Sequence, residues 1–445
     1  MSVAQTFAEF AANLRDVPDA VRHAATRCLV DWWGGAIAGS IEAPATVLRT
    51  ALRPRGGPAR LLPGGTSADA RTAALINGTA SHTVEVDDIY SPGLYHPGVA
   101  VIPAALAAAN AQNASGAELL AGIIAGYEVS NRIARAVNPA HYRFWHTTAT
   151  VGFIGAAAAA GRVQRLDTGQ IAHALTNAAS FAAGLRHAFS SDAMTKPLHA
   201  GRAAEGGLLA AMAAAEGLTG VPDMFEATRG FGAAMSDKPD WDQATEGLGS
   251  EWTIQRITCK PYPCCGHCFA AIDATSEIVG IGLDPTKIAK IHVGTYRAGV
   301  EICGNHDPQT PYEAKFSLPY CVGLAALGHP VDLAAFAEDR LHNPDLRAMM
   351  ARVRVGVDPE AEAAFPVLRP AEVMIMTIGG ETHRFRQPTR RGDPDFPLDD
   401  AALTAKFRML AAPVIGMEAA DQLGDALWQV AAFDRVAAIP AAAPL

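Results

Sequence analysis

Long stretches of the first 260 positions are apolar and repeat at helical intervals. Four windows show this best, at 104–110, 118–137, 151–163 and 203–216. A helix that is apolar on every side is a buried helix, and the small residues of the last window allow a close approach between helices. The pattern predicts a tightly packed helical region.

The hydrophobic pattern changes after Tyr262. Residues 268–280 still predict a helix, and so do 315–327, 332–338 and a stretch that begins at Asn343-Pro344. Between these helices the chain has short runs typical of β-strands, at 288–295, 352–357, 373–378 and 381–386. The glycine pair between the last two runs predicts a hairpin turn. This part is predicted to be α+β.

Helical intervals return after Gly392-Asp-Pro394, at 400–410 and 419–435. The simplest interpretation is a mainly α protein, with a large all-helical domain built from both chain ends and an inserted smaller α+β lid domain. The predicted domains are 1–262 (all-helical, first part), 263–395 (α+β lid) and 396–445 (all-helical, C-terminal part).

Composition narrows the function classes. A chain of 445 residues is too long for one ordinary core, and its 49% hydrophobic residues are enough for two. The net charge of −9 argues against a nucleic-acid partner, because there is no basic surplus to neutralise phosphates. It leaves room for an anionic small-molecule substrate, since a local basic cluster can oppose the net charge.

Cysteine usage indicates the compartment. The chain has seven cysteines, and four of them are crowded between Cys259 and Cys268. This is not a disulfide framework, and it indicates reducing surroundings. The first fifteen residues carry no secretory signal, and the longest apolar run, 149–161, is shorter than the ~20 residues that a membrane span needs. We expect a soluble, cytoplasmic protein with no membrane partner.

The crowded cysteines, together with His267, could also form a zinc site. Cys265 and Cys268 make one Cys-x-x-Cys pair, but no second, separated pair exists in the sequence. We therefore predict no metal. The segment that begins at Lys260 is interpreted instead as a proline-stiffened crossing between domains that presents His267.

A polar segment near position 90 carries candidate acid–base groups. Glu85, Asp87 and Asp88 precede a loop, rich in proline and glycine, that presents His96. A carboxylate close to an imidazole fixes its tautomer and raises its pKa, which suits general acid–base chemistry. The alternative is a helix end with solvated acids and a histidine in a turn.

A second polar segment, His141 to His146, stands just before an alanine-rich helix. It holds Tyr142 and Arg143, and donors near a helix N-terminus favour an anion. The alternative is a capping segment with packed aromatic rings. A third candidate, Lys196, precedes a proline and a strongly apolar helix, where a lysine is either a contact for an anion or a surface charge.

Several motifs are missing from the sequence. It has no phosphate-binding Gly-x-x-x-x-Gly-Lys loop and no dinucleotide-binding Gly-x-Gly-x-x-Gly after a strand. It also has no Gly-x-Ser-x-Gly elbow and no His-Glu-x-x-His. We therefore predict an enzyme without a nucleotide, metal or other cofactor.

The polar segments occur together and in a fixed order, and in this the chain resembles the MmgE/PrpD family. The resemblance covers roughly residues 30 to 410. The segments that carry it are Val86-Asp-Asp88, His96-Pro-Gly98, Gly126-Tyr-Glu128, His146 before Gly152, Lys196-Pro-Leu-His-Ala-Gly201, Gly217-Leu-Thr-Gly220, Lys260-Pro-Tyr-Pro263, Ala271-Ile-Asp-Ala274, Glu313–Tyr320, Gly392-Asp-Pro394 and Lys406-Phe407.

The resemblance implies a helical domain, an α+β lid, a cleft between them and a homodimer. It also implies the site residues, which map onto Asp87, Asp88, His96, His146, Lys196 and His267. Tyr142, Arg143 and Lys260 complete our set of candidates.

Members of this family include 2-methylcitrate dehydratase, cis-aconitate decarboxylase and iminodisuccinate epimerase. Compared with the dehydratase and decarboxylase pattern, Ile89 replaces a threonine after the aspartate pair, and Trp145 adds bulk before His146. Both differences favour an epimerase that acts on an iminodisuccinate-like polycarboxylate. The alternative is a dehydratase or decarboxylase of a citrate- or aconitate-like acid.

For an epimerase, the chemistry is removal and return of a proton next to a carboxylate. Lys196 would stabilise the enediolate, with His267 or Arg143 assisting. His96 and His146 would be the two bases, with Asp88 orienting one of them and Tyr142 able to replace one. Asp87, Arg143, His267 and Lys260 would bind the substrate.

Overall fold

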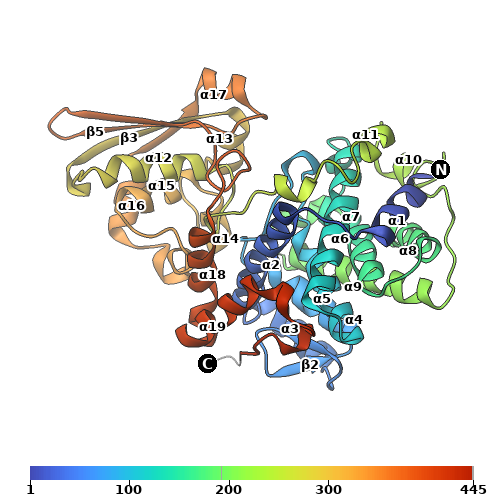
Figure 1. The fold of residues 1–445 in the computed structure, drawn as a ribbon. Helices are drawn as coiled ribbons and strands as arrows, with labels where there is room; N and C mark the ends of the chain where they lie inside the picture. The colour runs from blue at the N-terminus through green and yellow to red at the C-terminus, as the bar shows by residue number, and fades with distance from the viewer. Residues whose placement is uncertain (192, 443–445) are drawn as a thin grey trace. The chain divides into compact units, whose positions relative to one another are not determined.

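The computed structural model describes residues 1–191 and 193–442, and its fold is mainly α, as predicted. The chain divides into two compact units (Figure 1). Unit 1 comprises Met1–Cys259 and Asp399–Leu445, and unit 2 comprises Lys260–Leu398. The sequence placed domain boundaries after residues 262 and 395. That these boundaries separate independently folding domains stays a prediction.

Unit 1 is a bundle of long helices drawn from both ends of the chain. The helices are α1 (Val3–Asn13), α2 (Asp19–Gly39), α3 (Ala43–Leu52), α4 (Ala70–Ser81), α5 (Gly98–Gln112), α6 (Gly116–Val137), α7 (Thr147–Val163), α8 (Thr168–Phe181), α9 (Thr195–Ala215), α18 (Asp400–Ile415) and α19 (Met417–Trp428), with the short α10 (Phe231–Met235) and α11 (Trp241–Thr245).

Small residues let the central helices of unit 1 pack almost backbone to backbone. A methyl group added at Gly155 of α7 would lie 2.7 Å from the Cβ of Ser130 on α6. One added at Gly207 of α9 would lie 2.4 Å from the Cβ of Ala156 on α7. The apolar windows seen in the sequence are thus used inside unit 1. The homodimer implied by the resemblance stays a prediction.

A two-stranded sheet in unit 1 was not predicted. Strands β1 (Ala59–Leu61) and β2 (Thr66–Ala68) pair antiparallel across a tight turn that contains Gly64 and Gly65. Three residues are too few to show a period of two. The description of this domain as all-helical is corrected by these strands.

Unit 2 is α+β, with a four-stranded sheet in the order β4-β3-β5-β6. β3 runs parallel to β4 and antiparallel to β5, and β5 and β6 form the predicted hairpin. Side chains of β5 alternate between buried and half-buried, as expected for a sheet covered on one face. The strands are β3 (Ile288–Thr295), β4 (Val353–Val357), β5 (Ala371–Thr377) and β6 (Thr382–Gln387).

Some helices of unit 2 pack against this sheet, and others pack on those helices. α12 contacts β5 and β6, while α15 contacts α12 and β4 (Figure 1). The helices are α12 (Phe269–Gly280), α13 (Arg297–Cys303), α14 (Pro311–Lys315), α15 (Leu318–Ala326), α16 (Pro344–Met350) and α17 (Pro359–Ala364).

Three helix predictions differ from the structure in extent. The stretch 332–338 forms only a 3-10 turn, Ala334–Phe336. The helix expected from 315 begins at Leu318, because the Ser317 hydroxyl caps the Tyr320 N–H at 3.1 Å and Pro319 favours the first turn. α19 ends at Trp428 rather than at 435.

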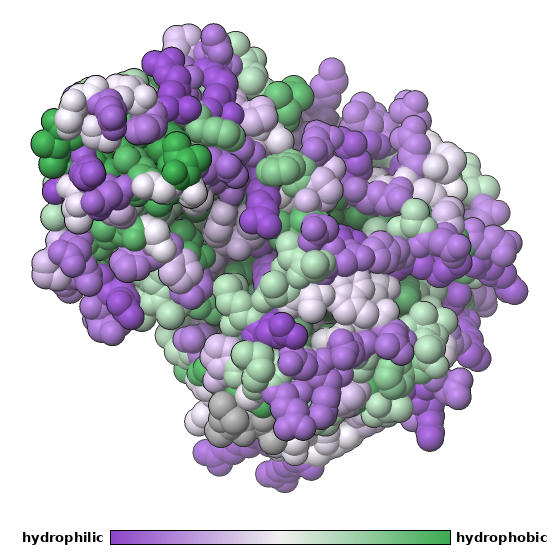
Figure 2. Space-filling model, turned by 60° about the vertical axis from the view of Figure 1, so that its left-hand side comes forward, coloured by the Kyte–Doolittle hydropathy of each residue, from purple (hydrophilic) through white to green (hydrophobic). Residues whose placement is uncertain are grey.

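The surface has a mixed character. Figure 2 shows polar side chains over most of the visible face, with smaller apolar groups between them. Within the described part of the chain, none of the helices has the length and hydropathy required to span a membrane.

Candidate active site

Four histidines from four separate segments of unit 1 lie in a row. Ring centroids are 5.1 Å apart for His96 and His82, 5.7 Å for His82 and His146, and 5.4 Å for His146 and His199. We call this set the histidine row. It gathers imidazole groups that are far apart in the sequence, so the fold rather than a local motif builds the site.

Helix ends position the histidine row. His82 directly follows α4, His96 lies two residues before α5, His146 caps the start of α7, and His199 lies near the start of α9. Three of these ends are N-termini of long helices, whose free N–H groups carry partial positive charge. The surroundings of the row therefore favour an anion.

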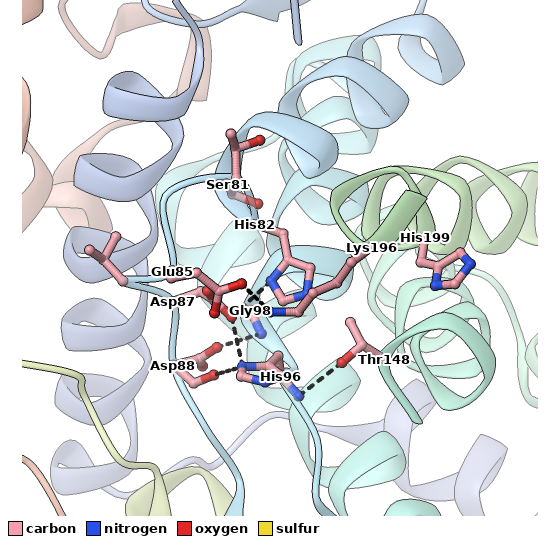
Figure 3. Close-up of polar contacts among 12 residues, drawn as sticks. Ser81, His82, Glu85, Asp87, Asp88, His96, Gly98, Thr148, Lys196 and His199 are labelled. Atoms are coloured by element: carbon pink, nitrogen blue, oxygen red, sulfur yellow. Dashed lines mark hydrogen bonds and ion pairs between the residues drawn. The ribbon is translucent and has the colours of Figure 1, made fainter. Parts of the chain in front are cut away.

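The Asp87 carboxylate joins two members of the row. Its Oδ2 lies 3.0 Å from His82 Nδ1 and 2.7 Å from His96 Nδ1 (Figure 3). His96 Nδ1 is also 2.8 Å from the backbone carbonyl oxygen of Asp88. A carbonyl oxygen only accepts, so His96 Nδ1 carries a proton and its Nε2 is left to exchange one with a ligand. The His96 side chain is 20% exposed, so this nitrogen can be reached.

Asp88 uses its carboxylate elsewhere. Its Oδ2 accepts a 2.7 Å hydrogen bond from the Tyr127 hydroxyl, and its Oδ1 accepts one of 3.0 Å from the Gly98 N–H. Burial raises the pKa of Asp88 to about 7, although the bond from Tyr127 opposes the shift. The orienting contact expected from Asp88 therefore comes from its carbonyl, and the carboxylate at the histidines belongs to Asp87.

Lys196 supplies the positive charge of the site. Its Nζ forms an ion pair with the Glu85 carboxylate (Figure 3). Burial alone would lower the pKa of Lys196, but the charges of Glu85 and Asp87 outweigh this and the pKa is raised. Glu85 has a φ of 63°, a backbone conformation uncommon outside glycine. Such strain is often found at functional sites.

The inner histidines are held neutral. Burial lowers the pKa of His82 to about 4, and it lowers that of His146 well below the usual range, with the neighbouring His82 ring and the positive charge of Lys196 adding to the effect. The Nε2 atoms of both rings are buried and have no hydrogen-bond partner among the described residues. Unpaired buried polar atoms are costly, so these two nitrogens mark a place that a ligand can satisfy.

His199 completes the row at its far end. Its Nδ1 lies 3.2 Å from His146 Nδ1, so one of the two nitrogens donates and the other accepts. Burial lowers the pKa of His199, which favours a neutral ring. The tautomer of His146 is thus coupled to that of His199.

The other candidates near His146 separate into two groups. Tyr142 lies close enough to Lys196 for its phenol to influence the lysine's pKa, and its ring stacks under the Arg186 guanidinium at 4.5 Å. Arg143 is exposed and lies over the Phe144 ring at 4.9 Å. The structure brings Tyr142 to the site and leaves Arg143 at the surface of unit 1.

Lys260 and His267 belong to unit 2. Lys260 is buried. His267 Nδ1 lies 2.6 Å from the Tyr296 hydroxyl, and burial, aided by the charges of Arg369 and Arg390, lowers the pKa of His267 to about 3. Their role in binding substrate stays a prediction.

Sequence reasoning missed two residues of the site and the role of a third. His82 and His199 complete the histidine row, and Glu85 pairs with Lys196. Each stands within five residues of a chosen candidate, but nothing in the spacing shows that the end of α4 meets the start of α9. A search for histidines next to predicted helix ends would have found the first two.

Among the residues that the structure describes, two groups of side chains have ligand atoms close enough together for a metal ion. The first is His82, Asp87 and His96, whose geometry the hydrogen bonds to Asp87 already explain. The second, in unit 2, is Cys264, Cys268 and Cys321. Cys259, which was weighed as a zinc ligand, lies in unit 1 instead.

Comparison with known proteins identifies the family. The model of the MmgE/PrpD N-terminal domain matches residues 5–244, more than half of the chain, and that of the MmgE/PrpD C-terminal domain matches residues 262–429. The chain therefore belongs to the MmgE/PrpD family.

Similar curated proteins include two cis-aconitate decarboxylases. The one from Homo sapiens is 28% identical over 367 residues, and the one from Mus musculus is 27% identical over 369 residues. Each alignment covers 79% of this chain and 74% of the relative. A cis-aconitate decarboxylase-like protein of Aspergillus oryzae is 30% identical over 240 residues, which covers 50% of this chain and 49% of that protein.

These relatives overturn the predicted epimerase. They are named as decarboxylases, which are lyases, so the isomerase assignment and iminodisuccinate as substrate are wrong. The structure weakens the argument that the bulk of Trp145 indicates a different substrate, because the Trp145 ring packs against a histidine that is held in place by the fold. The Trp145 ring stacks on His141 at 6.4 Å, and both His141 nitrogens are engaged, with the Met235 carbonyl and the Thr150 hydroxyl.

The other argument rested on Ile89. Its main chain pairs with Thr258 through two hydrogen bonds of 2.9 Å, which fixes the backbone there without a side-chain hydroxyl. Replacement of a threonine at this position is therefore weak evidence for a change of reaction.

Proposed function

We propose that this MmgE/PrpD-family chain is a lyase that decarboxylates a small unsaturated polycarboxylate of the cis-aconitate type. The observation that carries the proposal is the histidine row beside Lys196, where one proton-exchanging imidazole and one cation meet near three helix N-termini. The names of the relatives favour decarboxylation over loss of water.

The reaction needs one proton and no net redox change. In cis-aconitate, a carboxylate is attached to a methylene next to the carbon–carbon double bond. When its C–C bond breaks, carbon dioxide leaves and the electron pair forms a new double bond to that methylene. The original double bond opens, and its far carbon takes a proton. The site must therefore hold the remaining carboxylates and deliver one proton.

His96 is our proposed acid. Because its Nδ1 proton is directed to the Asp88 carbonyl and the Asp87 carboxylate, its Nε2 is the nitrogen that can deliver a proton. Asp87 also stabilises the protonated ring, as a carboxylate beside an imidazole does. Asp88 is then a positioning residue, through its carbonyl.

Lys196 is our proposed cation for a substrate carboxylate. Its charge is maintained by Glu85 and Asp87, and it lies beside the Phe189 ring, 5.8 Å from the centroid. Neutral His146 and His82 offer Nε2 atoms that suit the neutral or hydrogen-bonding parts of the substrate. Tyr142, close to Lys196, is proposed to bind the same carboxylate, and Arg143, Lys260 and His267 stay proposals for substrate binding.

The test is a reaction in heavy water followed by proton NMR. With cis-aconitate we expect carbon dioxide and an unsaturated dicarboxylate that carries one solvent deuterium on the newly saturated carbon. Citrate and 2-methylcitrate serve as comparison substrates. Formation of an unsaturated tricarboxylate from either of them, with cis-aconitate left intact, would replace the proposed decarboxylase by a dehydratase.

We also propose a homodimer in a reducing compartment, with a small anionic polycarboxylate as substrate. All seven cysteines are free thiols, which suits reducing surroundings. Sedimentation at micromolar concentration tests the dimer, and a monomer there would rule it out.

A further inference from the structure

Four cysteines from three segments meet in the core of unit 2. Cys264 precedes α12, Cys268 caps it, Cys303 ends α13, and Cys321 lies in α15. All four are completely buried. The Sγ atoms of Cys264, Cys268 and Cys321 lie within 4.8 Å of one another, and the Cys303 thiol hydrogen-bonds with that of Cys268. We call these four residues the cysteine cluster.

Sequence spacing hides this cluster. The pair visible in the sequence is Cys265-x-x-Cys268, whereas the structure pairs Cys264 with Cys268, a spacing that also occurs in zinc sites. The second pair, Cys303 and Cys321, comes from helices that the fold brings to the same point. The objection that no second pair exists therefore does not apply in three dimensions.

We propose that Cys264, Cys268, Cys303 and Cys321 bind one thiophilic divalent cation of the zinc type, as a structural centre of unit 2. Four sulfur ligands around zinc form a closed tetrahedral site, with Zn–S bonds of about 2.3 Å and sulfur atoms about 3.8 Å apart. The three sulfur atoms of Cys264, Cys268 and Cys321, which lie within 4.8 Å of one another, need to contract by about 1 Å or less, and Cys303, in contact with Cys268, supplies the fourth ligand.

Charge supports a cation held by thiolates. Four thiolates and one divalent cation leave two net negative charges, which are costly in a core unless they are compensated. Two lysines supply this compensation, since the positive charges of Lys260 and Lys315 both act on Cys264. Lys260 is only 3% exposed, so its charge acts with little screening by water.

Local main-chain bonds already hold the cluster in shape. The Cys265 N–H donates to the Lys315 carbonyl at 2.8 Å, and the Cys268 N–H donates to the Cys265 carbonyl at 2.9 Å. A bound cation would tie this loop to α13 and α15, beneath the sheet of unit 2. Metal binding of this kind contributes directly to folding free energy. The proposal is independent of the reaction at the histidine row.

The experiment measures metal in the full chain, expressed in zinc-supplemented medium and purified without chelator. We expect about one zinc per chain, by elemental mass spectrometry. Replacement by cobalt should give sulfur-to-cobalt charge-transfer absorption. The double variant Cys264→Ala/Cys321→Ala should lose both signals, while Cys259→Ser, a buried cysteine of unit 1, should keep them.

The metal content of the wild-type protein tests the proposal by itself. The test therefore holds even if the double variant folds poorly. No bound zinc or cobalt, with all seven thiols titrating after denaturation, would overturn the proposal and leave the cluster as ordinary apolar core. No metal with two thiols missing would overturn it in favour of a disulfide. Metal retained by the double variant would place the ion elsewhere.

Discussion

The histidine row of unit 1 and the cysteine cluster of unit 2 are built alike and differ in what they leave open. Each gathers four side chains that are spread along the sequence. In the row, the His96 and His199 rings are partly exposed, the Nε2 atoms of His82 and His146 have no hydrogen-bond partner, and Lys196 beside them forms an ion pair. The cluster is closed, and its thiols contact one another.

This difference distinguishes a site that suits a substrate from a site that suits a structural ion. Buried polar atoms in proteins are almost always paired, so unpaired ones need an explanation. At the histidine row, the proposed explanation is a substrate that binds reversibly and pairs with these atoms. At the cysteine cluster all four side chains are fully buried, which suits a permanent ion.

The largest expected effect is the loss of the proposed acid. His96→Asn should keep a hydrogen bond to Asp87 but cannot deliver a proton, so kcat should fall about 10³-fold. Steady-state kinetics with cis-aconitate checks this, with His292→Asn, on the sheet of unit 2, as the control. A folded His96→Asn variant with normal kcat would remove His96 from the mechanism.

A somewhat smaller loss is expected at Lys196. Lys196→Met keeps the length of the side chain and removes its charge, so kcat/KM should fall about 10²-fold. It also takes the Lys196 partner away from the Glu85 carboxylate. The double variant Lys196→Met/Glu85→Gln removes the charge of that carboxylate, so the loss of substrate binding is measured apart from the effect on Glu85. If the double variant regains full activity, the lysine serves only to neutralise Glu85.

The inner histidines should make stability depend on pH. The folded pKa of His82, about 4, is below its ordinary value of 6.5, so its contribution is fully present above pH 6.5 and is lost as the pH falls towards 4. Between these values His82 should cost the wild type about 2–3 kcal/mol of unfolding free energy.

Asp88 acts in the opposite direction, because its raised pKa favours the folded state at low pH. Comparison with a His82→Gln variant isolates the histidine. Urea unfolding of both proteins at pH 7 and pH 4.5 is the measurement. Equal changes in the two proteins would show that His82 is not held neutral.

The smallest effect concerns packing and contrasts the two units directly. Gly155→Ala should destabilise unit 1 by about 1–3 kcal/mol, because the new methyl meets Ser130 at 2.7 Å. Gly356→Ala in β4 has no atom within 4 Å of the added methyl and should change stability by less than about 0.5 kcal/mol. Calorimetry of both variants checks the contrast, which equal melting temperatures would contradict.

Much of the fold could be predicted, because periodicity reports local geometry. The mainly α class, the strands of unit 2 and the hairpin at Gly379-Gly380 all follow from repeats that the sequence displays. The β1–β2 pair could not be predicted, since three-residue strands show no period. The end of α19 at Trp428 depends on tertiary contacts that helical spacing does not report.

The site was only partly predictable, because chemistry is visible in the sequence and proximity is not. His96, His146, Lys196 and Asp87 were chosen for their residue types, and they do lie together. His82 joins them only because α4 ends beside the loop before α5. The choice of reaction failed because Ile89 and Trp145 were judged without their neighbours.

The Glu85–Lys196 pair described above acts as a competitor built into the protein. Before substrate arrives, the best cation of the site already has a carboxylate bound to it. A monocarboxylate would exchange one such contact for another and gain little. An acid with two or three carboxylates can displace Glu85 with one group while the others bind the helix N-termini. If Lys196 binds substrate as proposed, the ion pair sets a threshold of charge that a ligand must exceed, and it favours polyanions over monocarboxylates.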